Sequence, residues 1–130
     1  MLCYYIIVKN MTKSYRSIHV KNNKTKRKNK KYCMDVEFGD RNDNARLIGY
    51  PCHNGPNQKF RHNTKTKQLI AKHSGKCLEN VGRILQKRCN PSKKTQKWIQ
   101  KKGRWMSLSN KKYIDADNAV VLPLVTNSHV

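Results

Sequence analysis

The sequence is poor in acidic residues, glycine and proline, and it has no long apolar run. Only 7 Asp plus Glu stand against 29 Lys plus Arg, so the formal charge is +22. The 6 Gly and 4 Pro are too few for a low-complexity chain, and 130 residues predict a single domain. The apolar part of MLCYYIIVKN (residues 1–10) is too short to span a membrane and lacks the flanks of a signal peptide. We expect residues 3–8 (CYYIIV) to form a buried strand.

The excess of positive charge indicates a polyanionic partner, such as a heparin-like glycan or nucleic acid. It peaks in Lys21–Lys31, where seven of eleven residues are basic. Such a run repels itself and predicts a mobile loop. The alternative is an ordinary solvated surface without any partner, because runs of charge are usually solvated faces.

The apolar pattern predicts an all-β protein. No stretch keeps helical spacing for three turns, whereas short β-type runs alternate with turn-forming clusters. This organisation favours a barrel or a sandwich-like domain. The expected strands are Ser17–Val20, Cys33–Phe38, Ala45–Tyr50, Gln68–Lys72, Gly82–Gln86, Ile99–Gln100, Arg104–Leu108 and Ala119–Leu122.

An internal repeat divides the chain into three units of roughly 40 residues. Residues 72–89 align with 107–125 at a constant shift of 36, which places Glu79 on Asp115 and Cys89 on Val125. A further copy begins at KKYCMDV, where Cys-Met-Asp matches Cys-Leu-Glu of the second unit. Three such units can bury around a common axis the apolar faces that one unit leaves exposed.

Two of the units end in Gln-x-aromatic, as NQKF (57–60) and TQKW (95–98). We expect Phe60 and Trp98 to fill the centre of the domain. We expect the amides of Gln58 and Gln96 to bond backbone groups of the neighbouring turn, because buried amides need partners. The third unit stops before its own Gln-x-aromatic, which leaves one central position empty. We expect residues 3–8 to fill part of that gap.

The pattern resembles the ricin B-type lectin family, whose fold is a β-trefoil with three Gln-x-Trp repeats. The first unit is most similar to the C-terminal lectin domain of polypeptide N-acetylgalactosaminyltransferases. The matching stretches are YRSIHVKNN (15–23), CMDV (33–36), IGYPCHNGPNQKF (48–60), GKCLEN (75–80) and TQKW (95–98). The resemblance implies an all-β trefoil over residues 15–130, with repeats at about 15–62, 63–100 and 101–130 and the third truncated. Residues 1–14 would then form an N-terminal apolar segment.

The repeat positions that this resemblance assigns to cysteine imply two disulfides, Cys33 with Cys52 and Cys77 with Cys89. Each would stabilise the domain by about 2–4 kcal/mol, and both point to an oxidising compartment. Because no signal peptide is evident, the compartment stays open. Zinc is the rival explanation of these cysteines, but no C-x2-C or H-x3-H spacing supports it.

A sugar site needs an aromatic ring under the C–H face and a carboxylate and an amide for the hydroxyls. In the family these are the acid of Cys-x-Asp, the aromatic two residues before the second Cys and the Asn before the Gln. The resemblance thus assigns them to Asp35, Tyr50 and Asn57, with His53 and Asn54 at the rim. Taken singly, these residues are more typical of a turn cap, a core tyrosine and a turn former. Their occurrence together at the family's positions favours a site.

The other repeats lack this set, so we expect one working site. The second has Lys87 for the aromatic and Thr95 for the Asn, and the third has Pro123 for the aromatic. The resemblance implies a carbohydrate-binding module for galactose or N-acetylgalactosamine. The alternatives are a polyanion-binding trefoil that uses Lys21–Lys31 and a decayed lectin fragment. No nucleophile–base pair, metal-ligand set or phosphate loop is present, so we expect neither an enzyme nor a cofactor.

Overall fold

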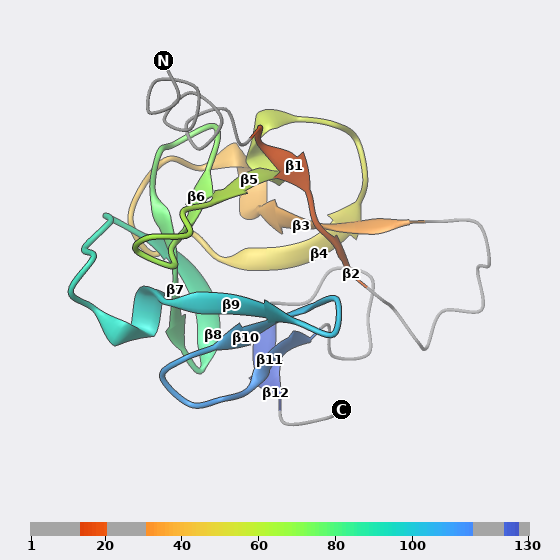
Figure 1. Cartoon of the computed structure of the whole chain (residues 1–130). Helices are drawn as coiled ribbons and strands as arrows, with labels where there is room; N and C mark the ends of the chain where they lie inside the picture. The colour runs from red at the N-terminus through yellow and green to blue at the C-terminus, as the bar shows by residue number, and fades with distance from the viewer. Residues whose placement is uncertain (1–13, 21–30, 116–123, 128–130) are drawn as a thin grey trace, which may run out of the picture.

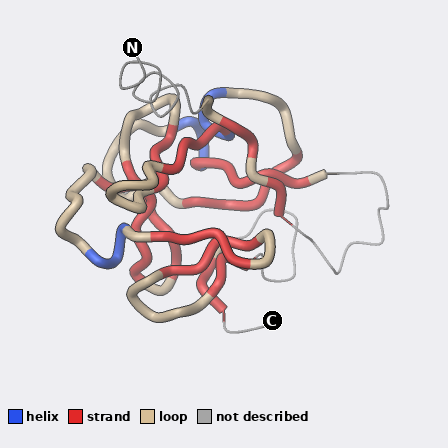
Figure 2. Tube along the Cα trace, in the orientation of Figure 1, coloured by secondary structure: helices blue, strands red, loops and turns tan. Residues whose placement is uncertain are grey.

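The computed structural model describes residues 14–20, 31–115 and 124–127. Within these ranges the chain is built from short strands and three single 3₁₀ turns (Figure 2). The first two strands, β1 (Arg16–Ser17) and β2 (His19–Val20), are separated only by Ile18. The other strands are β3 (Tyr32–Val36), β4 (Leu47–Pro51), β5 (Lys59–His62), β6 (Leu69–Ala71), β7 (Cys77–Val81), β8 (Arg83–Lys87), β9 (Trp98–Lys101), β10 (Arg104–Ser107), β11 (Tyr113–Asp115) and β12 (Val125–Asn127).

The strand pairs recur in three sets, which confirms the predicted all-β trefoil. All neighbours are antiparallel, and β2–β3–β4, β6–β7–β8 and β10–β11–β12 follow the same order (Figure 1). A fourth strand leads from one set to the next, since β5 pairs with β6 and β9 pairs with β10. Because each set repeats the same pairings, equivalent residues can be read directly from the registers.

The core lies where the three sets meet. Leu47, Ile84 and Leu124 occupy equivalent positions, and all three are fully buried. The backbone N–H of Ile84 donates to Leu124 O at 3.0 Å, and that of Leu124 donates to Leu47 O at 2.8 Å. Phe60 and Trp98 are buried in the same cluster, as predicted for the two Gln-x-aromatic motifs. Burying side chains of this size contributes roughly 1.5–3 kcal/mol each.

The register of the third repeat corrects the constant shift of 36 that the sequence indicated. Glu79 pairs with Leu85 in the second repeat, whereas Asp115 pairs with Val125 in the third. Val125 therefore matches Leu85 and not Cys89. The chain between β11 and β12 is four residues longer, so the shift becomes 40 after the insertion. By the same register Asn127, rather than Pro123, stands at the position of the aromatic.

Two other expectations about the strands change. The strand predicted over Cys33–Phe38 ends at Val36, because Phe38 has a positive φ of 61° and belongs to the 3₁₀ turn η1 (Glu37–Gly39). The strands β5, β7, β11 and β12 were not predicted from the apolar runs, because polar residues interrupt them. The predictions for residues 1–13, for Ala119–Leu122 and for most of Lys21–Lys31 lie outside the described residues. No helix within the described ranges is long and apolar enough to cross a membrane.

Candidate functional site

The carboxylate of Asp35 is the centre of a polar cluster at the end of β3. Asp35 is only 3% exposed. Its Oδ2 accepts a hydrogen bond from Gln58 Nε2 at 2.8 Å, and its Oδ1 accepts one from Asn57 Nδ2 at 3.1 Å. His53 Nε2 lies 3.3 Å from Oδ2. Since both oxygens are held, the carboxylate has one fixed orientation.

Burial raises the pKa of the Asp35 carboxyl above its ordinary value, although the contacts with Gln58, His53 and Asn57 each lower it. The backbone N–H of Gly55 donates to His53 Nδ1 at 3.0 Å. His53 Nδ1 is therefore the unprotonated ring nitrogen, and Nε2–H faces Asp35. A neutral imidazole satisfies both of its contacts, while the carboxylate keeps acceptor capacity for a ligand hydroxyl.

Gln58 joins this cluster to the loop that follows β4. Its Nε2 also donates to Pro51 O at 3.0 Å, and its Oε1 accepts the backbone N–H of His53 at 2.9 Å. The Gln58 amide thus hydrogen-bonds the backbone on both sides of Cys52. The disulfide Cys33–Cys52 closes the same loop onto β3, as predicted, and Cys77–Cys89 does so in the second repeat.

Tyr50 and Asn54 lie farther out than the other predicted site residues. Tyr50 is 40% exposed and meets the ring of His53 edge-on, with the centroids 6.1 Å apart. Asn54 is exposed, and its Oδ1 accepts a hydrogen bond from Lys59 Nζ at 3.1 Å. The structure therefore links Asp35, His53 and Asn57 by direct contacts and reaches Tyr50 through His53. Asn54 bonds Lys59 rather than a member of this group.

The second repeat contains the same framework without the outer residues. Gln96 Nε2 donates to Glu79 Oε1 at 2.8 Å and to Arg88 O at 2.9 Å, while its Oε1 accepts the N–H of Asn90 at 2.9 Å. These contacts match those of Gln58. The register places Lys87 at the position of Tyr50, since each pairs with the first Cys of its repeat.

The bond between Gln58 and Asp35 was missed by the sequence analysis, which expected the Gln amides to serve backbone groups only. The same bond recurs between Gln96 and Glu79, so the Gln-x-aromatic motif holds the acid of its own repeat. The recurrence of Cys-x-acid and Gln-x-aromatic in the same units was the available signal. Gln58 is consequently both a fold residue and the residue that positions the candidate carboxylate.

One group of described side chains has a spacing that would suit a metal ion, and it consists of His19, Cys33 and Cys52. Both sulfur atoms belong to the disulfide. A disulfide offers no thiolate, and thiolates are the ligands that zinc takes from cysteine. This group is therefore explained by the covalent bond.

Comparison with known proteins identifies the family. A sequence model described as the ricin-type beta-trefoil lectin domain matches residues 9–98, more than half of the chain. The chain belongs to this family. None of the curated protein sequences matches it significantly. The ricin-type lectin assignment places the domain in the carbohydrate-binding class.

Solved structures share this trefoil at low sequence identity. A designed threefold-symmetric protein, ThreeFoil, superposes with a TM-score of 0.74 at 20% identity, covering 90% of each chain. The C-half of an earthworm R-type lectin, solved in complex with GalNAc, gives 0.70 at 14% identity over 90% of this chain and 88% of that one. GalNAc-T7, solved with UDP, GalNAc and Mn2+, gives 0.64 at 20% identity over 98% of this chain. The match spans only 23% of GalNAc-T7, so it concerns a part of that protein.

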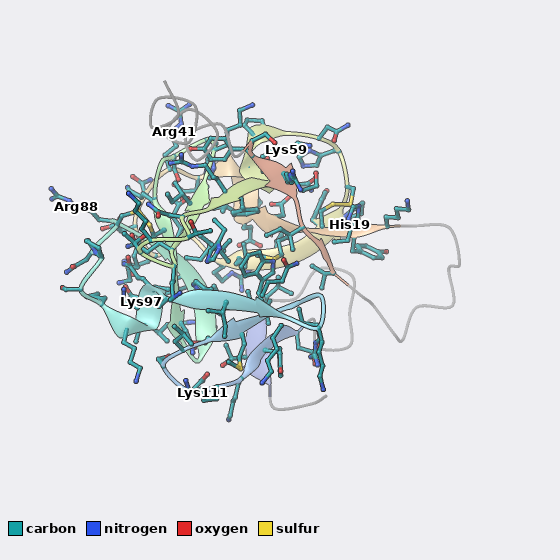
Figure 3. The ribbon with its side chains drawn as sticks, in the orientation of Figure 1. His19, Arg41, Lys59, Arg88, Lys97 and Lys111 are labelled. Carbon is teal, nitrogen blue, oxygen red and sulfur yellow. A yellow bond between two sulfur atoms is a disulfide. The ribbon has the colours of Figure 1, made fainter. Side chains whose placement is uncertain are left out.

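Five basic side chains of the described ranges, Arg41, Lys59, Arg88, Lys97 and Lys111, are labelled in Figure 3 and come from different segments of the chain. A polyanion site needs basic groups on one face or along one groove. The polyanion hypothesis thus depends on Lys21–Lys31 and stays a prediction from the sequence.

Proposed function

We propose that this domain binds a terminal galactose- or N-acetylgalactosamine-type sugar through one site in its first repeat, formed by Asp35, Tyr50, His53, Asn54 and Asn57. The observation that carries the proposal is the fixed carboxylate of Asp35. It lies beside an amide donor, Asn57, and below an exposed aromatic pair, Tyr50 and His53. The GalNAc in the earthworm lectin complex supports this class of sugar.

The roles follow from the chemistry of a pyranose. Asp35 accepts a hydrogen bond from one sugar hydroxyl at its remaining acceptor site, and such a charge-assisted bond is stronger than a neutral one. The Asn57 side chain supplies an amide beside the carboxylate, and Tyr50 presents an apolar ring to the C–H face of the sugar. A single shallow site of this kind gives a Kd of about 1 mM, or about −4 kcal/mol.

Titration with N-acetylgalactosamine, followed by calorimetry or by NMR, tests the proposal. Asp35→Asn removes a charged acceptor worth about 1.5–3 kcal/mol, so the affinity falls at least about tenfold. Asn57→Thr places at this position the residue type of Thr95 in the second repeat, and we expect the same loss with the fold intact. Glu79→Gln is the matched control, because it removes the equivalent carboxylate from the repeat that lacks the outer residues.

Two outcomes would overturn the proposal. One is an Asp35→Asn or Asn57→Thr variant that keeps its melting temperature and binds the sugar as the wild type does. The other is binding to glycans that collapses between 50 and 200 mM salt, a range in which phosphate-type contacts lose their affinity, and that ignores both substitutions. The second outcome would favour the polyanion hypothesis.

A further inference from the structure

Phe38 is the most exposed large apolar side chain in the part of the chain that the structure describes. It is 94% exposed, against 50% for Val81 and 40% for Tyr50. Its backbone is also unusual, with φ 61° and ψ 11° inside η1. This left-handed conformation strains a residue with a bulky side chain. The free protein thus holds an aromatic ring in water on a strained backbone.

The second repeat shows what this position requires. Phe38 is the third residue after Asp35, and the third residue after Glu79 is Gly82, whose φ is also positive at 96°. Glycine adopts this conformation without strain. The turn therefore favours glycine, and packing does not explain the Phe, because almost its whole surface is in contact with solvent. Its exposure and its strained backbone together single out this ring as a candidate ligand contact.

The turn that carries Phe38 is attached to the proposed sugar site. Asn57 Nδ2, which bonds Asp35, also donates to Val36 O at 3.0 Å. A Cβ on Gly39 would lie 4.0 Å from Asn57 Cγ. Phe38, between Val36 and Gly39, consequently stands on the Asn57 side of the carboxylate.

Tyr50 pairs with Cys33, two residues before Asp35, whereas Phe38 follows Asp35 by three residues. From Cys33 to Val36 the strand advances about 10 Å. That length exceeds a single pyranose ring resting on Asp35. A ligand that touches both Tyr50 and Phe38 is therefore longer than a monosaccharide.

The turn is held rigidly at both ends. Arg46 Nη2 donates to both carboxylate oxygens of Glu37, at 2.8 Å each. At the other end the carbonyl of Asp40 accepts from Gln86 Nε2 at 3.0 Å and from His73 Nε2 at 2.7 Å. The backbone that carries Phe38 therefore loses little further freedom when a ligand binds.

We propose that Phe38 is a second sugar contact, which packs on the apolar face of the saccharide ring next to the one bound by Asp35. The proposal rests on the proposed function and deepens it, because it makes a disaccharide the preferred ligand. Stacking of an aromatic ring adds an affinity factor of about fivefold. The wild type therefore binds a disaccharide with terminal N-acetylgalactosamine about fivefold more tightly than the methyl glycoside of that sugar.

The test compares these two ligands on the wild type, Phe38→Gly and Val81→Gly, by calorimetric titration at one salt concentration. Phe38→Gly copies the residue that stands at Gly82, so we expect it to keep or raise the melting temperature. It lowers the disaccharide affinity to that of the methyl glycoside and leaves the methyl glycoside affinity unchanged. Val81→Gly, which removes an exposed apolar side chain from the second repeat, changes neither affinity.

Several results would refute this role. If Phe38→Gly has the disaccharide affinity of the wild type, Phe38 is not a sugar contact, although the proposed sugar site is unaffected. The same conclusion follows if the affinities for both ligands fall equally. A third ligand, a short peptide carrying N-acetylgalactosamine on threonine, shows whether Phe38 contacts a second saccharide or the peptide next to the terminal sugar. If Phe38→Gly lowers the affinity for the glycopeptide and not for the disaccharide, Phe38 contacts peptide and the saccharide proposal is wrong. If no ligand binds, or Asp35→Asn has no effect, the proposed function fails as well.

Discussion

Gly55→Ala is expected to lower the affinity of the proposed sugar site with little effect on the stability of the fold. The backbone φ of Gly55 is −65°, so alanine fits without strain. The new Cβ, however, would lie 2.6 Å from His53 Cε1, 2.8 Å from His53 Nδ1 and 2.9 Å from Asn57 Oδ1. All three atoms belong to the tips of side chains in the proposed site. Both side-chain tips must therefore shift, which displaces His53 and Asn57 from their positions beside Asp35.

The cost in stability is small. Displacing His53 removes the hydrogen bond from the Gly55 N–H, worth about 0.5–1.5 kcal/mol. Replacing glycine by alanine at a compatible φ returns about 0.4–1 kcal/mol through the unfolded chain. The free energy of unfolding therefore changes by less than about 1 kcal/mol. For a domain of this size that shifts the melting temperature by no more than about 4 °C.

Sugar affinity falls by at least about tenfold, because the displaced side chains of His53 and Asn57 no longer match the position of the bound sugar. The matched control is Gly75→Ala. A Cβ on Gly75 meets nothing within 4 Å, but its φ is +71°. This variant therefore loses about 1–2 kcal/mol of stability and keeps the sugar affinity. Thermal denaturation gives the melting temperature of each variant, and calorimetric titration gives its sugar affinity. A Gly55→Ala protein with wild-type affinity would refute the geometry proposed for the site.

Three further predictions concern charge, covalent closure and the amide framework. Since burial raises the pKa of folded Asp35 above its ordinary 3.8, the folded protein binds this proton more tightly than the unfolded chain. The Asp35 contribution to stability is therefore present below the unfolded pKa and lost as pH rises through the folded pKa. Sugar affinity rises over the same pH interval, because the carboxylate becomes charged. Sugar titrations and thermal melts from about pH 3.5 to 7 should show both trends in the wild type and neither trend in Asp35→Asn. Replacing Cys77 and Cys89 by alanine lowers the free energy of unfolding by about 2–4 kcal/mol in urea melts and spares the sugar site. Gln96→Ala orphans the N–H of Asn90 and costs about 1–3 kcal/mol in the same assay.

The fold was predictable because its determinants are local motifs repeated in register. Cys-x-acid, a second Cys and Gln-x-aromatic recur in two units, and the disulfides and the buried Phe60 and Trp98 follow from them. The third unit was harder, because it has neither cysteine to fix the alignment. The alignment at a constant shift therefore did not include the four-residue insertion between β11 and β12. Only the hydrogen-bond register, with Asp115 opposite Val125, reveals it.

The predicted site residues could be named from the sequence, but their contacts could not. That Gln58 holds Asp35 depends on the 3₁₀ turn at Pro56–Gln58 folding back onto β3. Phe38 shows the same limit, because its position in an apolar run over Cys33–Phe38 favoured a strand. The left-handed turn that exposes it is set by Glu37 bonding Arg46, nine residues away. Periodicity carries no information on such a pair.

The two repeats together separate what the fold needs from what a ligand needs. A buried acid held by the Gln amide occurs in both, at Asp35 and Glu79, so this bond stabilises the trefoil whether or not sugar binds. In the second repeat the acid also has Lys93 Nζ 3.6 Å away, and Lys87 occupies the position of Tyr50. The first repeat keeps the framework and adds Asn57 and an exposed aromatic pair. Because the framework alone has a structural reason, the proposed sugar binding depends on those additions, and we expect substitutions there to alter affinity without unfolding the domain.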